Sequence, residues 1–138
     1  MKDCQMLNFK QWLLSEYNFT NPQNLKPDPN YLYHGTNDQN LYDIAQSGFL
    51  NVFEPSHGTD QETWPDGETE ERSYWTQNPA TTLFFIPHGK PVIIRTKHIP
   101  SKFHKERNTN DFYTTQPVPI KQLEVLVNNN WIPVNQIT

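Results

Sequence analysis

The clearest hydrophobic pattern is a run of three consecutive aliphatic residues within PVIIRTK (91–97). A short apolar run between turn residues is typical of a strand that is buried on both faces. Two further apolar runs, LEVLV (123–127) and WIPV (131–134), flank NNN, and this spacing predicts a β-hairpin. Weaker alternation predicts short strands at residues 31–34, 49–53, 73–76 and 112–118.

Helical periodicity is concentrated in the first half of the chain. Residues 7–18 place four apolar side chains on one helical face, namely Phe9, Trp12, Leu13 and Tyr17. Residues 40–47 are also amphipathic, and Gly48 follows as a C-terminal stop signal. Pro79 can open a short helix that runs to Phe85. The pattern therefore predicts an α+β domain that is mostly β, with two or three short helices.

The length of 138 residues suits a single domain, with an N-terminal helix and connection at 1–30 and a core at 31–134. A net charge of −4 argues against a general binder of nucleic acid or anionic membranes. We expect no signal peptide and no membrane span, since no apolar run approaches about 20 residues. The only cysteine is Cys4, which fits a reducing, cytoplasmic compartment.

The long segment between Glu54 and Arg72 is acidic, rich in turn residues and without periodicity. Loops of this length in compact domains are usually either functional or disordered. Its histidine, His57, lies near Asp60 and Glu62, which is the best grouping for a metal in the chain. The five histidines show no paired ligand spacing, so we expect no metal.

Three short stretches stand out together: YHGT (33–36), SYWT (73–76), and an aspartate, Asp111, before a strand that leads into PVPIKQLEVL. Each has an ordinary explanation alone, as a turn, an aromatic core strand and a loop carboxylate. In this order the chain resembles the His–Tyr–Glu class of ADP-ribosyltransferases, which contains diphtheria toxin and the poly-ADP-ribose polymerases. The resemblance covers residues 31–134, and it implies a split antiparallel β-sheet core.

The first motif of that family is an apolar strand ending in His-Gly-Ser/Thr, followed by a helix with a buried isoleucine and a final glycine. This chain has LYHGT, then Ile44 and Gly48. The second motif supplies a tyrosine before a short helix, which corresponds to Tyr74 in SYWTQNPATTLFF. The third motif opens with a glutamate, and Asp111 stands at that position.

The aspartate is a departure from the family pattern. Its side chain is one methylene shorter than glutamate, and a displacement of about 1 Å can cost on the order of a hundredfold in rate. Either the backbone moves closer, or the protein is slow or inactive, or Gln116 or Glu106 takes the role. An inactive member would be a module that binds NAD, ADP-ribose or a protein.

The resemblance implies that NAD is the substrate and that no metal takes part. His34 then bonds a ribose hydroxyl, Gly35 bonds the nicotinamide amide through its backbone, and Thr36 adds a contact. Tyr74 stacks on the nicotinamide ring, with Tyr42 as a second aromatic partner.

The catalytic residues implied by the resemblance are Asp111, Tyr74 and His34. Asp111 would stabilise the positive charge that develops on the ribose when nicotinamide leaves. By analogy with the family, a small transferase of this kind suits a bacterial or phage effector or toxin.

In this family the loop before the third motif meets the acceptor, which here is FHKERNTND (103–111). Lys102, Lys105 and Arg107 make the loop locally basic. The chain has only three arginines, whereas nucleic-acid sites need several for phosphates. We therefore rank a protein acceptor first, nucleic acid second and water, giving simple NAD hydrolysis, third. The sequence leaves the oligomeric state open.

Overall fold

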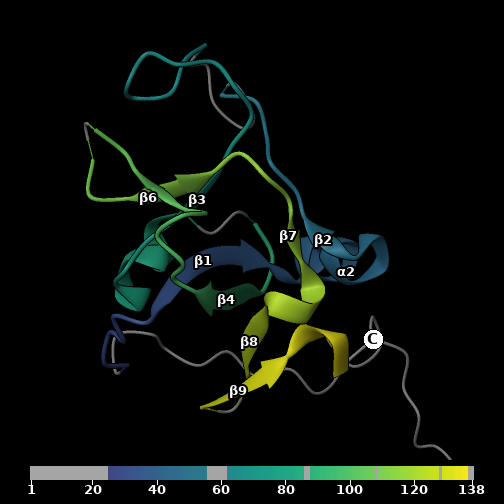
Figure 1. The fold of residues 1–138 in the computed structure, drawn as a ribbon. Coiled ribbons are helices and arrows are strands. Elements are labelled where there is room, and N and C mark those ends of the chain that lie inside the picture. Colours follow the sequence, from purple (N-terminus) through teal and green to yellow (C-terminus); the bar gives the residue numbers. More distant parts are fainter. Residues whose placement is uncertain (1–24, 56–61, 86–87, 108, 128, 137–138) are drawn as a thin grey trace, which may run out of the picture.

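The computed structural model describes residues 25–55, 62–85, 88–107, 109–127 and 129–136. Within these ranges, antiparallel sheets of four, three and two strands accompany a single α-helix (Figure 1). This arrangement agrees with the predicted α+β class. The predicted helix at 7–18 lies outside the described residues, as do Cys4, His57 and Asp60.

The four-stranded sheet has the order β1-β4-β8-β9, and all its neighbours are antiparallel. Its strands are β1 (Tyr31–Asn37), β4 (Pro91–Lys97), β8 (Glu124–Val127) and β9 (Asn130–Pro133). The prediction of a buried strand at 91–97 is confirmed, since Val92, Ile93 and Ile94 are fully buried. The predicted hairpin is confirmed too, because Val127 pairs with Asn130.

A three-stranded sheet lies above β1 in Figure 1, in the order β3-β6-β5. Its strands are β3 (Ser73–Trp75), β6 (Phe112–Thr114) and β5 (His104–Lys105). This sheet joins the four-stranded sheet through a bridge between Tyr33 and Thr76, whose backbone groups exchange hydrogen bonds of 2.8 and 2.9 Å. The bridge brings the YHGT and SYWT stretches side by side.

The helix α2 (Asp38–Ser47) follows β1 directly and covers the core with Leu41, Ile44 and Ala45. It begins two residues earlier than predicted because Asn37 caps it, accepting a hydrogen bond from the Asn40 N–H. It ends as predicted at Gly48, which has φ = 87°. The strands β2 (Phe49–Leu50) and β7 (Val118–Pro119) pair beside it.

Short 3₁₀ helices complete the described fold: η2 (Pro79–Phe85), η3 (Ile120–Gln122) and η4 (Val134–Gln136). The helix expected at Pro79–Phe85 therefore forms, as a 3₁₀ helix. The strand expected at 112–118 is instead divided into β6 and β7, and β5 forms inside a segment predicted to be a loop. No helix among the described residues is long and apolar enough to cross a membrane.

Candidate functional site

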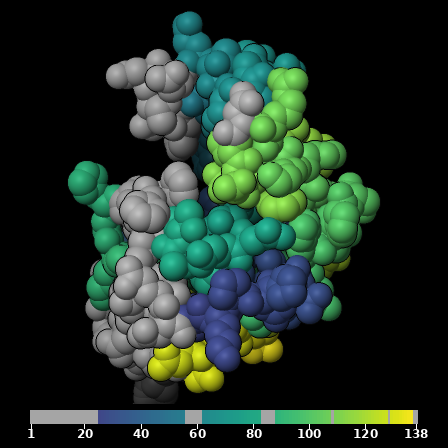
Figure 2. All heavy atoms as spheres, turned by 90° about the vertical axis from the view of Figure 1, so that its left-hand side faces the viewer, coloured from purple at the N-terminus to yellow at the C-terminus, as the bar shows by residue number. Residues whose placement is uncertain are grey.

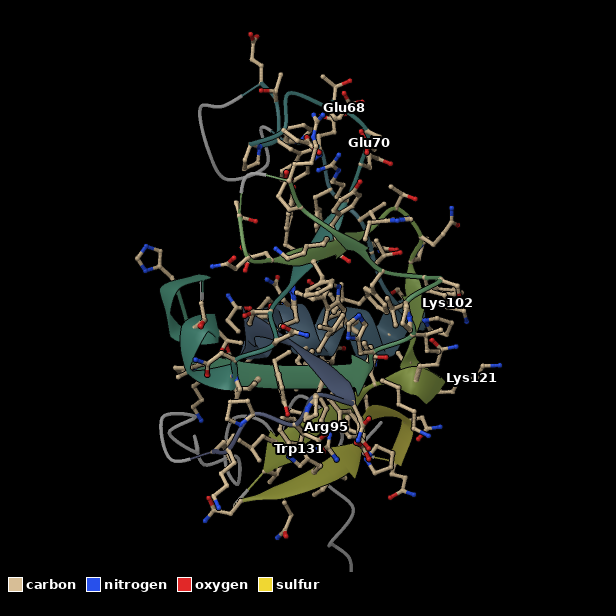
Figure 3. The ribbon with its side chains drawn as sticks, turned by 60° about the vertical axis from the view of Figure 1, so that its left-hand side comes forward. Glu68, Glu70, Arg95, Lys102, Lys121 and Trp131 are labelled. Atoms are coloured by element: carbon tan, nitrogen blue, oxygen red, sulfur yellow. The ribbon has the colours of Figure 1, made fainter. Side chains whose placement is uncertain are left out.

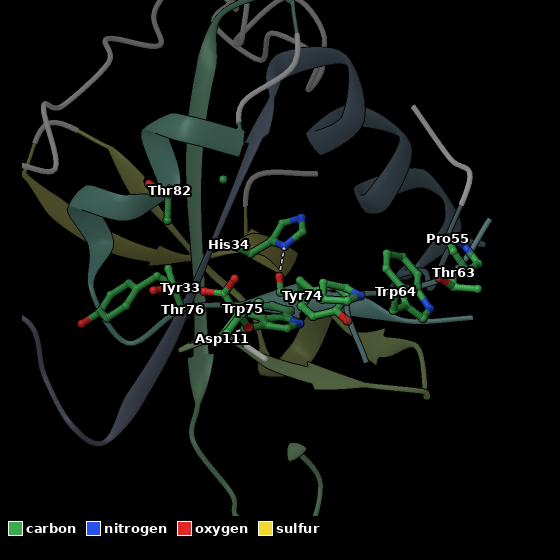
Figure 4. Close-up of a pocket in the computed structure, with 13 residues that line it drawn as sticks. Tyr33, His34, Pro55, Thr63, Trp64, Tyr74, Trp75, Thr76, Thr82 and Asp111 are labelled. Atoms are coloured by element: carbon green, nitrogen blue, oxygen red, sulfur yellow. Dashed lines mark hydrogen bonds between the residues drawn. The ribbon is translucent and has the colours of Figure 1, made fainter. Parts of the chain in front are cut away.

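A pocket of about 510 Å³ opens where β1, β3 and the segment before β6 meet (Figure 4). Of the residues predicted for a ligand site, His34, Gly35, Tyr74 and Asp111 all line it. The rest of the lining is mainly aromatic side chains, prolines and threonines: Tyr33, Pro55, Thr63, Trp64, Pro65, Trp75, Thr76, Thr82 and Thr109. Three stretches that are far apart in the sequence thus converge on one cavity.

His34 presents a hydrogen-bond acceptor to this pocket. Its Nδ1 lies 2.8 Å from the backbone carbonyl oxygen of Tyr74 (Figure 4). A carbonyl only accepts, so Nδ1 carries the proton and the neutral ring keeps a lone pair on Nε2. Burial lowers the pKa of His34 below its ordinary value, against the opposing effect of the hydrogen bond to Tyr74. The neutral form therefore dominates at neutral pH.

Gly35 offers its backbone to the same pocket. Backbone groups of successive residues in an antiparallel strand point to alternate edges. Tyr33 directs its N–H and C=O to Thr76, on the edge of β1 away from β4. Gly35, two residues later, therefore directs its own N–H and C=O to this same edge. It has no side chain to shield them from a ligand.

Tyr74 contributes a ring that is held from three sides. The ring centroid lies 4.9 Å from that of Trp64 and 5.9 Å from that of Tyr113. Its hydroxyl donates to Glu106 Oε2 at 2.7 Å and accepts from Arg72 Nη1 at 2.8 Å. Burial, together with the hydrogen bond to Glu106, raises the pKa of Tyr74. The phenol therefore stays protonated at neutral pH and acts as a positioned ring.

Asp111 brings a carboxylate to the pocket wall. Its backbone is fixed, because its N–H donates to Thr109 Oγ1 at 3.1 Å and its C=O accepts from the Glu106 N–H at 2.9 Å. Among the described residues, its carboxylate has no hydrogen bond or ion pair. Burial, followed by the nearby charge of Glu106, raises the pKa of Asp111. A cation in the pocket would act in the opposite direction, lowering this pKa and favouring the carboxylate.

Trp64 and Arg72 also belong to this region, although neither lies in a sequence motif that predicts a site residue. The Trp64 indole N–H donates to the Glu70 carbonyl at 2.6 Å, which holds the ring beside Tyr74 (Figure 4). Arg72 lies behind the pocket wall and bonds the Tyr74 hydroxyl. The signal in the sequence is a single tryptophan within the long acidic loop, since loops of this length are often functional.

Four other predicted candidates lie away from the pocket lining. Thr36 is buried on β1 with only 3 % of its surface exposed, and Tyr42 packs on the core from α2. Tyr42 is therefore not the second aromatic of this pocket, a position that Trp64 occupies. Glu106 is buried against Arg72 and Tyr74, and Gln116 is exposed after β6. Asp111 is thus the only one of the three suggested carboxylate or amide groups that lines the cavity.

The basic loop predicted to meet an acceptor lies beside the pocket wall. Lys102, Lys105 and Arg107 are exposed, and Arg107 Nη2 donates to the Asp66 carbonyl at 2.7 Å. Figure 2 shows the segment 62–72, in teal, next to the green segment around β6. In the described part of the chain, no cluster of three or more His, Cys, Asp or Glu side chains could hold a metal ion.

The pocket combines aromatic walls, an imidazole acceptor, the backbone edge of Gly35 and a carboxylate. Such a set suits a flat cationic ring with an amide substituent and an attached polyhydroxyl group. In comparisons with known proteins, the chain matches no protein-family model, no curated protein and no solved structure. What the pocket binds is therefore inferred from its own side chains.

Proposed function

We propose that this protein is an ADP-ribosyltransferase that cleaves NAD and transfers one ADP-ribose to a macromolecular acceptor, first of all a protein. The observation that carries this proposal is the convergence of His34, Tyr74 and Asp111 on one pocket. We further propose that the sheets form the split core of the His–Tyr–Glu family and that the protein acts in a cytoplasm, which supplies NAD.

The nicotinamide end of NAD matches the part of the pocket formed by Gly35, Tyr74 and Trp64. Its carboxamide needs one donor and one acceptor, and the Gly35 backbone edge supplies both. Its flat, positively charged ring suits the aromatic side chains of Tyr74 and Trp64. A hydroxyl of the adjoining ribose can then donate to His34 Nε2, which is unprotonated at neutral pH.

The reaction breaks the bond between ribose C1′ and the nicotinamide nitrogen. The bonding electron pair leaves with nicotinamide, which becomes neutral, and positive charge develops on the ribose. The Asp111 carboxylate stabilises that charge, as the second carboxylate does in glycosidases. A nucleophilic atom of the acceptor then bonds to C1′ and releases its proton to solvent.

The distribution of arginine favours a protein acceptor over nucleic acid. Arg72 is buried among carboxylates, and Arg95 is paired with Glu124 at 2.8 Å. Arg107 is therefore the arginine that lies exposed near the pocket, beside Lys102 and Lys105. This small set suits an acidic protein surface better than a run of phosphates.

Replacement of Asp111 tests the proposal. The purified protein is expected to release nicotinamide from NAD, and Asp111→Asn should lower that rate by about a hundredfold or more. Burial raises the pKa of Asp111, so its charge does not favour folding at neutral pH, and the variant should fold. Asp43→Asn, a change at an exposed carboxylate on α2, is the matched control and should keep the wild-type rate.

A second experiment, with labelled NAD, separates a protein acceptor from nucleic acid, from NAD hydrolysis and from binding without turnover. Labelled NAD incubated with a lysate should leave protease-sensitive label if the acceptor is protein, and nuclease-sensitive label if it is nucleic acid. Free ADP-ribose alone would indicate an NAD hydrolase. A wild-type protein that binds NAD without releasing nicotinamide would overturn the enzymatic proposal and leave a binding module.

A further inference from the structure

Arg72 is the most heavily bonded side chain in the described part of the chain. It directly precedes β3 and only 1 % of its surface is exposed. It does not line the pocket, and it ends the wall segment 63–72. Its guanidinium lies between the rest of that segment and the three-stranded sheet. A buried arginine is costly unless its donors are satisfied, so its partners indicate its role.

Those partners are three carboxylates, one phenol and two aromatic faces. The guanidinium bonds Glu70 Oε1 through Nε at 3.0 Å and Nη2 at 2.7 Å, Asp66 Oδ2 at 2.9 Å, Glu106 Oε2 at 3.0 Å and the Tyr74 hydroxyl at 2.8 Å. Its Cζ also lies 3.7 Å from the ring centroid of Tyr113 and 5.9 Å from that of Trp64. A single planar group thus connects segment 63–72 with β3 and β6.

These contacts fix both aromatic walls of the pocket. Tyr74 is held through its hydroxyl, on which Arg72 and Glu106 converge. Trp64 is held through the Glu70 carbonyl, and the Glu70 side chain is bonded twice to Arg72. Arg72 thus links the Trp64 and Tyr74 rings, whose centroids lie 4.9 Å apart, without lining the cavity itself.

We propose that Arg72 is a positioning residue, which sets the spacing and orientation of the Trp64 and Tyr74 rings and so determines how tightly the pocket holds a flat aromatic ligand. The identity of that ligand as the nicotinamide end of NAD rests on the proposed function. Lysine cannot replace Arg72, because an ammonium group lacks the planar fork that reaches several carboxylates at once.

A pair of conservative variants tests this role. Arg72→Lys should raise the KM for NAD about tenfold, about the value of one desolvated cation–π contact between a wall ring and the nicotinamide, with kcat changed by less than about threefold. Arg95→Lys is the matched control, because Arg95 also bonds a carboxylate, Glu124, and lies 4.4 Å from the Trp131 ring centroid. Figure 3 shows Arg95 and Trp131 at the opposite end of the molecule from Glu70. Arg95 lies opposite the pocket residue Tyr33 rather than beside Trp64 or Tyr74, so this variant should raise the KM far less than Arg72→Lys does.

Tyr74→Phe supplies an independent arm, because it keeps the ring and removes the hydroxyl that Arg72 bonds. Tyr74→Phe should raise the KM for NAD. In the Tyr74→Phe background, Arg72→Lys should raise the KM by a smaller factor than it does in the wild-type protein, as expected for coupled residues. Additive effects would overturn the proposal. If Arg72→Lys fails to fold, the Tyr74→Phe variant still decides the question, because an unchanged KM in that variant overturns the proposal.

A spectroscopic measurement separates this proposal from the proposed function. In protein labelled with 5-fluorotryptophan, the Trp64 resonance can be assigned by its loss in Trp64→Phe. Arg72→Lys should shift or broaden that resonance without any NAD present, and Arg95→Lys should leave it unchanged. An unmoved Trp64 resonance overturns the positioning role, whereas a moved resonance in a protein that never consumes NAD overturns only the proposed function.

Discussion

His34 is held as a neutral imidazole whose Nε2 can accept a hydrogen bond. The hydrogen bond from Nδ1 to the Tyr74 carbonyl fixes the tautomer, and burial lowers the pKa of the ring. Adding a proton to Nε2 would place a charge in the pocket and convert the acceptor into a donor. Both stability and ligand binding should therefore respond to acid at this residue.

The sign of the pH dependence follows from the lowered pKa of His34. Below the ordinary histidine pKa of 6.5, the unfolded chain binds a proton that the folded state resists. The stability that neutral His34 contributes is complete above pH 6.5. It is lost as the pH falls from 6.5 toward the lower pKa of His34 in the folded state. Urea unfolding of wild type and His34→Gln on both sides of 6.5 measures it.

The wild-type protein should lose more unfolding free energy than His34→Gln on acidification through this range. The other histidines contribute equally to both proteins, so the difference isolates His34. Equal losses in the two proteins would contradict the lowered pKa.

At the scale of elements, the helix α2 is closed at both ends by residues of the first motif region. Asn37 caps its start through a 2.7 Å hydrogen bond to the Asn40 N–H. Gly48 closes its end with φ = 87°, and its N–H donates to the Ile44 carbonyl at 2.9 Å. These caps fix where α2 begins and ends after β1. The strand β1 itself holds His34 and Gly35 at the pocket.

Gly48→Ala should destabilise the protein by about 1 kcal/mol, because a side chain in the left-handed region is strained. A Cβ at this position would meet nothing within 4 Å, so no clash adds to that cost. The midpoint of urea unfolding measures the change, and Gln46→Ala on the exposed face of α2 is the control. NAD kinetics should be unchanged in both variants, and equal stability of the two would refute the role of the cap.

At the scale of the whole molecule, the pocket lies at the junction of two sheets that meet through the Tyr33–Thr76 bridge. A ligand seated there contacts β1, β3 and segment 63–72 at once. A ligand that binds only the folded state raises the free energy of unfolding, by about 2.7 kcal/mol when its free concentration is a hundred times Kd. Ligand binding should therefore stabilise the whole domain rather than one loop.

NAD should raise the melting temperature of Asp111→Asn, in which turnover is expected to be about a hundredfold slower and so consumes little ligand. Trp64→Ala in the same background should lose most of that shift, because one aromatic wall of the pocket is gone. Thermal unfolding at several NAD concentrations measures both. A shift that survives Trp64→Ala in full would show that NAD binds elsewhere.

The local pattern determined several elements in advance. The buried strand at 91–97, the helix with its Gly48 stop and the hairpin of β8 and β9 all follow from periodicity and turn residues. Such signals are local, because burial of a strand or of one helix face is written into neighbouring residues. The motif residues His34, Tyr74 and Asp111 were also identified from the sequence as candidates for one site.

Only the tertiary structure decided which side chains share the pocket. Tyr42 was expected there but packs on the core, whereas Trp64, from the aperiodic loop, lies against Tyr74. The position of Trp64 depends on Arg72, whose carboxylate partners are spread from Asp66 to Glu106. Hydrogen bonds between residues so distant in the chain leave no periodic trace in the sequence, so they emerge only when the sheets have come together.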